Sequence, residues 1–253
     1  MCGRYYRQSD KQKIAETFHV ARWAPDVHMA PDYNIAPSTF QPIIRSSPED
    51  GEREIVLMRW GLIPAKAADP DSFKIFSTTN ARAETILEKP IWKGPFQHSR
   101  CLVVLDGFYE WLQRPSLPQP PSIEPGEHGW FGEIAAPAKP AAKPKAGSRP
   151  AYKFEMPDGA PYALAGLFSE WRPRRGDSRP PLDTFSIVTT EANEITEPIH
   201  DRMPVILHPR DYDRWLNETR PPIDLLRPYE SESMRMTPAT DWLATSAITA
   251  QRC

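Results

Sequence analysis

Short runs in which apolar and polar residues alternate dominate the chain, and they predict a protein built mainly of strands. The segments FQPIIRS and REIVLMRW flank residues 48–51, PEDG, a pattern typical of a β-hairpin. Because the strands do not alternate regularly with helices, the sequence predicts an α+β fold with mixed, largely antiparallel sheets. The other predicted strands lie in CLVVLDGFYEW, AYKFE, YALAGLFSEW, TFSIVTT and MPVIL.

Helical periodicity is limited to a few segments. Ser9, with Gln12 three residues later, predicts a capping box that opens a helix ending near Val20. Later helices are predicted around Asp211 to Leu216 and around Thr240 to Ala247.

The stretch STTNARAET, residues 77–85, predicts another helix, which ends before Pro90. Asn80 would then be an N-cap that accepts hydrogen bonds from the first free backbone amides. The same helix N-terminus, with Arg82 in its first turn, would also suit a phosphate. The two roles are compatible, and the sequence leaves both open.

Composition narrows the class of protein. With 253 residues the chain is long enough for one large or two small domains. Its 31 Lys and Arg nearly balance 33 Asp and Glu, so a nucleic-acid surface would have to be a local basic patch. Three scattered cysteines predict neither a disulfide framework nor a zinc site and favour a reducing cytoplasm. Neither a secretion signal nor a membrane span is predicted.

Proline is unevenly distributed. Nine of the 30 prolines lie between Pro115 and Pro150, in a segment with little periodicity. This composition predicts an extended insertion, at about 115–150, between two ordered elements. The insertion is either a docking loop for a protein partner or a tolerated surface loop, and we expect the chemistry to lie outside it.

Three single residues are candidates for chemistry. If Met1 is removed, Cys2 carries a free α-amine and a thiol on one residue, although a cysteine at a frayed terminus is an alternative. Glu110 follows an aliphatic strand and stands between aromatic residues, where partial desolvation would raise its pKa. His200 stands in a polar loop before an apolar strand, where an imidazole can carry a proton. The simpler alternative is an exposed glutamate at a strand end for Glu110 and a structural role for His200.

Six motifs in order decide between these alternatives: Cys2-Gly3-Arg4, YNIAP, RWGLIP, NARAET, DGFYEW and IHDRMP. Together they closely resemble the SOS response-associated peptidase family, whose members are also called abasic-site-processing proteins. The resemblance spans roughly Cys2 to Leu207.

The resemblance implies one compact α+β domain over residues 2–253, with a barrel-like core, flanking helices and a shallow basic groove for single-stranded DNA. It implies a monomer that acts in the cytoplasm, at the nucleoid, on abasic sites, with no metal or organic cofactor. Removal of Met1 would be autocatalytic or left to an aminopeptidase. Carried over by motif, the nucleophile is Cys2, and the surrounding active-site groups are Asn80, Glu110 and His200. The implied phosphate contacts are Arg4, Arg82 and Arg202, with Asn34 and Thr189 as lesser candidates.

The implied chemistry explains why a cysteine stands at the terminus. An α-amine with a pKa near ~8 attacks an aldehyde more readily at neutral pH than a lysine with a pKa near ~10.4. The thiol then closes a thiazolidine ring. Two alternatives stay open: an amidohydrolase of the glutamine amidotransferase type, and a non-covalent single-strand-binding module fed by the basic loop RPRRGDSR, residues 172–179.

Overall fold

The computed structural model describes residues 3–113 and 150–239 of the chain. Cys2, nearly all of the Pro-rich insertion and the helix predicted around Thr240 to Ala247 lie outside these ranges. Strands predominate in the described part, and its three α-helices are short. The predicted α+β class is therefore confirmed.

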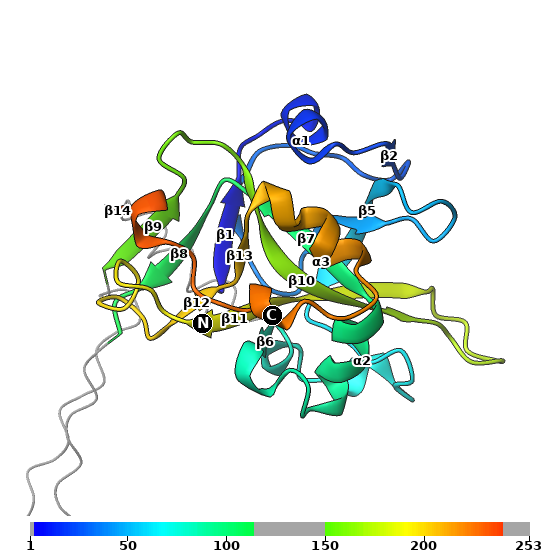
Figure 1. The fold of residues 1–253 in the computed structure, drawn as a ribbon. Helices are drawn as coiled ribbons and strands as arrows, with labels where there is room; N and C mark the ends of the chain where they lie inside the picture. The colour runs from blue at the N-terminus through cyan, green and yellow to red at the C-terminus, as the bar shows by residue number, and fades with distance from the viewer. Residues whose placement is uncertain (1–2, 114–149, 240–253) are drawn as a thin grey trace, which may run out of the picture.

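The smaller of two sheets has five strands in the order β14-β9-β8-β1-β3, and all of its pairings are antiparallel. In β1, Arg4 lies opposite Tyr109 of β8. The chain therefore enters this sheet next to Glu110, the residue that follows Tyr109. Figure 1 shows β1 and β8 side by side. The five strands are β1 (Arg4–Arg7), β3 (Asp32–Ile35), β8 (Gly107–Trp111), β9 (Ala151–Glu155) and β14 (Arg235–Pro238).

The larger sheet has nine strands, with a main order of β12-β11-β10-β7-β4-β5-β2; β6 pairs with β11, and β13 with β10. Its parallel pairs are β2 with β5, β5 with β11 and β6 with β11. The predicted hairpin is confirmed as β4 and β5. The strands are β2 (Arg22–Trp23), β4 (Phe40–Ser46), β5 (Arg53–Trp60), β6 (Asn80–Arg82), β7 (Arg100–Leu105), β10 (Tyr162–Trp171), β11 (Leu182–Glu191), β12 (Arg202–Pro204) and β13 (Ile206–Leu207).

One apolar core lies between the two sheets. Tyr5 and Phe108 of the smaller sheet and Trp60, Val103 and Phe185 of the larger sheet are all fully buried in it. The rings of Tyr5 and Trp60 join the two sheets, with centroids 5.3 Å apart. The sheets thus enclose a barrel-like core, as predicted.

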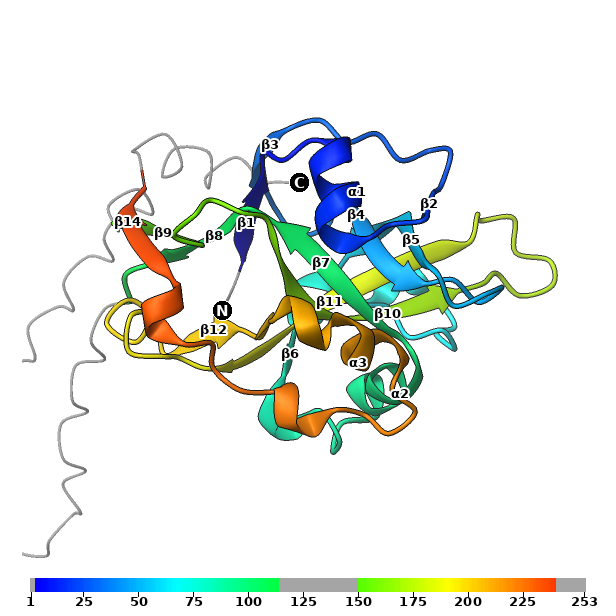
Figure 2. The ribbon, with the colours of Figure 1, turned by 45° about the horizontal axis from the view of Figure 1, so that its top comes forward.

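A second core lies on the other face of the larger sheet, where the three helices cover it. Phe18 stacks on Tyr212 at 5.4 Å between ring centroids, and Phe96 contacts Trp215 at 5.9 Å. The helices lie at the opposite side of the molecule from β9 and β14 (Figures 1 and 2). They are α1 (Lys11–Phe18), α2 (Pro90–His98) and α3 (Tyr212–Asn217), and α3 confirms a predicted helix. Short 3₁₀ helices are Pro70–Ser72, Ile75–Ser77, Ala83–Thr85, Pro209–Asp211, Ile223–Leu225 and Ser231–Ser233.

The predicted strand CLVVLDGFYEW is in fact two strands in different sheets, because the chain crosses between sheets at Asp106-Gly107. The Asp106 carboxylate accepts hydrogen bonds from the backbone N–H groups of Gln8 at 2.7 Å and Ser9 at 2.9 Å. A Cβ atom at Gly107 would lie 2.4 Å from the ring of Tyr6, so only glycine fits there. This crossing places β8 in the smaller sheet beside β1.

Two predicted helix starts are wrong. The N-cap of α1 is Asp10, whose side chain accepts from the Lys13 amide at 2.8 Å, whereas the Ser9 hydroxyl donates to Asp106. Residues 80–82 form β6, and α2 begins only at Pro90. In both cases a partner distant in sequence forms the hydrogen bonds with polar groups that the local pattern assigns to a helix. No helix within residues 3–113 and 150–239 is long and apolar enough to cross a membrane.

Candidate functional site

The Glu110 side chain lies buried near the end of β8, and only 3% of the residue is exposed. The strand is paired on both sides, with β1 and with β9, where Glu110 lies opposite Tyr152. Burial disfavours the charged form and raises the pKa of the carboxyl to about 7. The expected burial is confirmed, and a carboxyl of this kind can take up and release a proton near neutral pH.

Asn80 begins β6, which runs parallel to β11 and sets Asn80 opposite Ile187. The carbonyl oxygen of Thr79, just before it, accepts from the Trp60 indole at 2.9 Å and from the Ile187 amide at 3.0 Å. Asn80 is therefore held by the sheet and the core. Its predicted role as a helix N-cap is wrong, and so is the phosphate site predicted at a helix N-terminus, because Arg82 ends a strand.

His200 lies near the end of the loop between β11 and β12. Its backbone amide donates to the Thr196 carbonyl at 2.9 Å, and the Asn193 side chain holds the same turn by accepting from the Thr196 amide at 3.1 Å. Burial lowers the pKa of the imidazole to about 4, so the ring is neutral at pH 7.

Two groups contact the same nitrogen of this ring. The Arg202 amide lies 3.0 Å from His200 Nδ1, and Asp201 Oδ1 lies at the same distance from that nitrogen. A backbone N–H group can only donate and a carboxylate can only accept, so the two contacts favour opposite tautomers of the neutral ring. Both groups hold the ring in place at this end of the loop.

Tertiary contacts join the segments that carry these three side chains. The Gln113 amide, just after β8, donates to the Ile199 carbonyl at 2.8 Å, and the Gln113 side chain reaches Asp201 at 3.3 Å. These contacts bring the Glu110 strand against the His200 loop. On the other side, β11 pairs with both β6 and β12, so the Asn80 and Arg202 segments flank one strand.

The predicted DNA contacts fall into two groups. Arg4 donates to the Asn34 side chain at 2.5 Å on the smaller sheet, beside β8, and burial lowers the pKa of Arg4. Arg82 is exposed at the end of β6. Thr189 is fully buried, so its side chain does not face solvent, and its carbonyl instead accepts from Arg202 at 2.9 Å.

Two further residues of this site were not predicted from the sequence. Gln113 joins β8 to the His200 loop, and Glu84 forms a two-point ion pair with Arg202. Glu84 stands inside the NARAET motif, but its partner lies 118 residues away. Local pattern carries no signal for such a pair.

The basic loop at residues 172–179 is less cationic than its sequence suggests. Arg172 is paired with Asp183 at 2.6 Å, and Arg179 with Asp69 and Asp177 at 2.6 and 2.7 Å. These pairs weaken the alternative in which the loop drives single-strand binding.

Other groups with chemical potential lie apart from the site. Cys101 is buried, and burial raises the pKa of its thiol, so this sulfur is a poor nucleophile. Within the described ranges, no group of three or more His, Cys, Asp and Glu side chains suits a metal ion.

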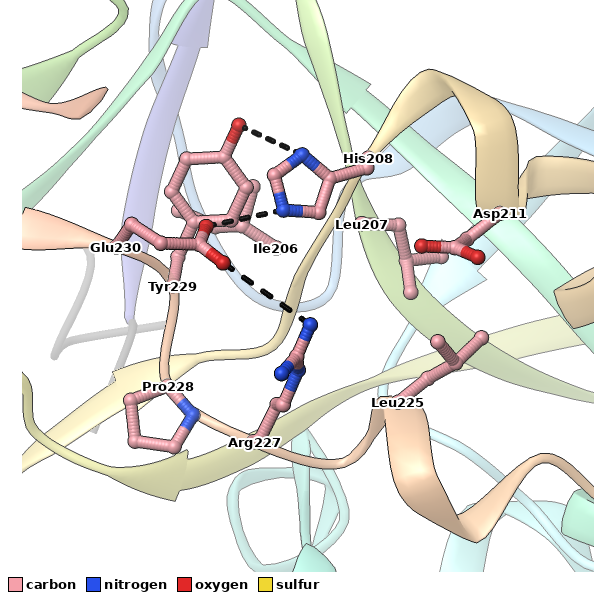
Figure 3. Close-up of a pocket in the computed structure, with 9 residues that line it drawn as sticks. All are labelled: Ile206, Leu207, His208, Asp211, Leu225, Arg227, Pro228, Tyr229 and Glu230. Atoms are coloured by element: carbon pink, nitrogen blue, oxygen red, sulfur yellow. Dashed lines mark hydrogen bonds and ion pairs between the residues drawn. The ribbon is translucent and has the colours of Figure 1, made fainter.

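A small pocket near the C-terminal segment is closed by its own side chains (Figure 3). His208 Nε2 lies 2.9 Å from Glu230, and His208 Nδ1 lies 3.4 Å from the Tyr229 hydroxyl. Both imidazole nitrogens are therefore engaged. The pocket joins β13 to the segment before β14, and none of the predicted site residues lines it.

The fold and this site define a mixed α+β protein in which three joined segments carry a buried carboxyl, an amide and a neutral imidazole, and the carboxyl lies on the strand beside the start of β1. The chain belongs to the SOS response associated peptidase (SRAP) family, since the family profile matches residues 1–245.

Named relatives support this assignment, and a solved structure has a similar fold. The abasic site processing protein YoqW of Bacillus subtilis (strain 168) is 34% identical over 92% of this chain and 90% of its own length. The abasic site processing protein HMCES of Gallus gallus is 33% identical over 83% of this chain and 62% of its own length. A crystal structure from Bacteroides thetaiotaomicron matches with a TM-score of 0.72 and 25% identity, over 94% of this chain and 92% of that one.

Proposed function

We propose that this protein processes abasic sites in single-stranded DNA and that Cys2 forms a covalent adduct with them. The names of the relatives support abasic-site processing. The observation that carries the covalent chemistry is the buried Glu110 carboxyl, with a pKa raised to about 7 by burial, at the point where the chain enters the sheet. A nucleophile just ahead of β1 would work beside this proton donor.

Ring opening is the first step of the proposed reaction. An abasic deoxyribose is mostly a closed hemiacetal, and an amine attacks only its open aldehyde. The protonated Glu110 carboxyl is suited to transfer a proton during opening, and the neutral imidazole of His200 is suited to hydrogen-bond the sugar oxygen that opening releases. Asn80 would hydrogen-bond the sugar or the Cys2 backbone and hold the attack geometry.

The bonds then form at the aldehyde carbon. The neutral α-amine of Cys2 adds to this carbon, and loss of the aldehyde oxygen as water gives a Schiff base. The Cys2 thiol adds to the same carbon, its proton passes to the nitrogen, and a five-membered thiazolidine closes. The closed ring has no imine to accept electrons, so β-elimination and strand cleavage are suppressed. A lysine would stop at the Schiff base.

The DNA contacts follow the two groups of side chains described above. Arg4 with Asn34, and Arg82 on the other side, would bind phosphates, and the net charge of −2 makes such local contacts necessary. Binding should therefore weaken as salt increases.

The deciding experiment is a denaturing gel of the protein with an abasic single strand. We expect a heat-stable adduct with the mature protein and none when the N-terminal amine is acetylated or follows a tag, although the thiol remains. Cys2→Ser should give a Schiff base that borohydride traps, some strand cleavage and little heat-stable adduct. An undamaged strand of the same sequence is the control. A blocked protein that still forms the stable adduct would contradict the mechanism and point to an internal lysine.

A further inference from the structure

An ion pair joins the segments that follow Asn80 and His200. Arg202 Nη1 contacts Glu84 Oε1, and Arg202 Nη2 lies 3.0 Å from Glu84 Oε2, so the contact is made at two points. Arg202 Nη2 also donates to the Thr189 carbonyl of β11 at 2.9 Å. One guanidinium thus ties the 3₁₀ turn after β6 and the start of β12 to the strand between them.

Both ends of this ion pair are close in sequence to an active-site group. Glu84 lies four residues after Asn80, within the turn Ala83–Thr85 that directly follows β6. Arg202 lies two residues after His200, and its amide donates to His200 Nδ1 at 3.0 Å. A shift of Arg202 would therefore move a hydrogen-bond donor of the His200 ring.

We propose that Glu84 is a positioning residue for the crosslinking reaction: through Arg202 it sets the distance between Asn80 and the imidazole of His200. This role rests on the function proposed above. It also gives Arg202 a task besides the expected phosphate contact, because two of its nitrogens already face a carboxylate.

Because the ion pair is partly exposed, its effect on the reaction rate can be distinguished from its effect on the stability of the fold. The Glu84 side chain is 50% exposed, and that of Arg202 is 13% exposed. Ion pairs with an exposed partner contribute little to folding. Reaction rate, in contrast, is sensitive to small displacements of groups around the reacting carbon. Loss of Glu84 should thus affect the rate much more than the melting temperature.

The test measures adduct formation with an abasic single strand in single turnover, over a range of DNA concentrations. Glu84→Gln should lower the rate at saturating DNA about tenfold or more and change the half-saturating concentration much less. Glu84→Asp, which keeps the charge, should retain part of the rate. Glu88→Gln is the matched control, because it removes an exposed carboxylate from the same segment and should react like the wild type.

Arg202→Gln tests whether the two residues act as a unit. If they do, the double variant Glu84→Gln/Arg202→Gln should react no more slowly at saturating DNA than Arg202→Gln alone. Melting temperatures of all variants should stay close to that of the wild type.

Several results would overturn the proposal. An unchanged saturating rate in Glu84→Gln, with tighter binding and a steeper salt dependence, would show that Glu84 only shields Arg202 from phosphate. Equal slowing in Glu88→Gln would reveal a general charge effect. A wild-type protein that binds strands without forming an adduct would overturn the proposed function itself, whereas a reactive wild type with an equally reactive Glu84→Gln would overturn only the role of Glu84.

Discussion

Glu110 combines a functional property with a cost to folding. Its pKa is about 7 in the folded protein, against an ordinary value of 4.5. The folded state therefore binds the proton more tightly than the unfolded chain does. Stability from this group is fully present below pH 4.5 and is lost as the pH rises through 7. A residue kept at such a cost is a good candidate for proton transfer.

The raised pKa of Glu110 predicts that replacing its carboxyl changes the stability of the fold in a pH-dependent way. Glu110→Gln should raise the free energy of unfolding relative to the wild type at pH 8, by up to about 3 kcal/mol, and by much less at pH ~3, where the carboxyl is protonated in both states. Denaturant unfolding at the two pH values measures this, with Glu88→Gln as the exposed control. A difference that does not depend on pH would show that Glu110 is not the titrating group.

The second prediction concerns the rate of adduct formation. The rate should rise with pH as the Cys2 amine loses its proton near ~8 and should fall as Glu110 ionises above about 7, giving a bell-shaped profile. Glu110→Gln should slow the reaction and remove the falling limb. His200→Ala should slow it and keep that limb, because the imidazole, with a pKa of about 4, is already neutral in this range. Loss of the falling limb in His200→Ala would exchange the two assignments.

Among the elements, the ends of α2 and α3 depend on one buried arginine at the start of β7. Arg100 Nη1 donates to the carbonyls of Phe96 at 2.8 Å and Gln97 at 2.9 Å, in the last turn of α2. Its other nitrogens donate to the carbonyls of Trp215 and Glu218, at the end of α3. These carbonyls have no partner within their own helices, and the charge is favourable at both C-termini.

We expect Arg100→Met to destabilise the fold by about 2–4 kcal/mol, because it leaves several buried carbonyls without donors. Thermal unfolding measures the loss, and Arg220→Met, at an exposed position, should change little. Adduct formation well below the melting temperature should be retained, since Arg100 lies against the helices and away from β8. A stable Arg100→Met protein would show that water replaces the arginine.

For the whole molecule, the Pro-rich insertion enters and leaves at one place. Trp111 of β8 pairs with Ala151 of β9, and the Leu112 amide donates to the Pro150 carbonyl at 3.0 Å. The two ends of the insertion are thus adjacent strand ends, and a short connector can join them. Loop length adds little to the free energy of closure, so the fold does not require the long form.

Replacing residues 115–149 with a short Gly/Ser connector should therefore preserve folding, strand binding and adduct formation. Circular dichroism and the denaturing gel measure this, with the full chain as reference. A folded deletion that no longer binds single strands would show that the insertion contributes to the DNA surface.

Local features of this protein follow from the order of residues along the chain. Alternation predicts the β4 and β5 hairpin, and the aliphatic run ahead of Glu110 indicates a partly desolvated carboxyl. These features depend on neighbouring residues, whose side chains face the core or solvent according to their period. The motifs also identify the family, because residue types and their order are read directly from the sequence.

Which segments pair depends on contacts between residues far apart in the chain. It made Asn80 a strand residue, because β11 takes the backbone groups that a helix would have used, and it joined Glu84 to Arg202 across 118 residues. Such contacts form when the sheets close around their common core. The free energy that selects these contacts comes from burial and from partners far away in the chain. Where tertiary contacts and local secondary-structure propensity favour different structures, the tertiary contacts therefore determine the result.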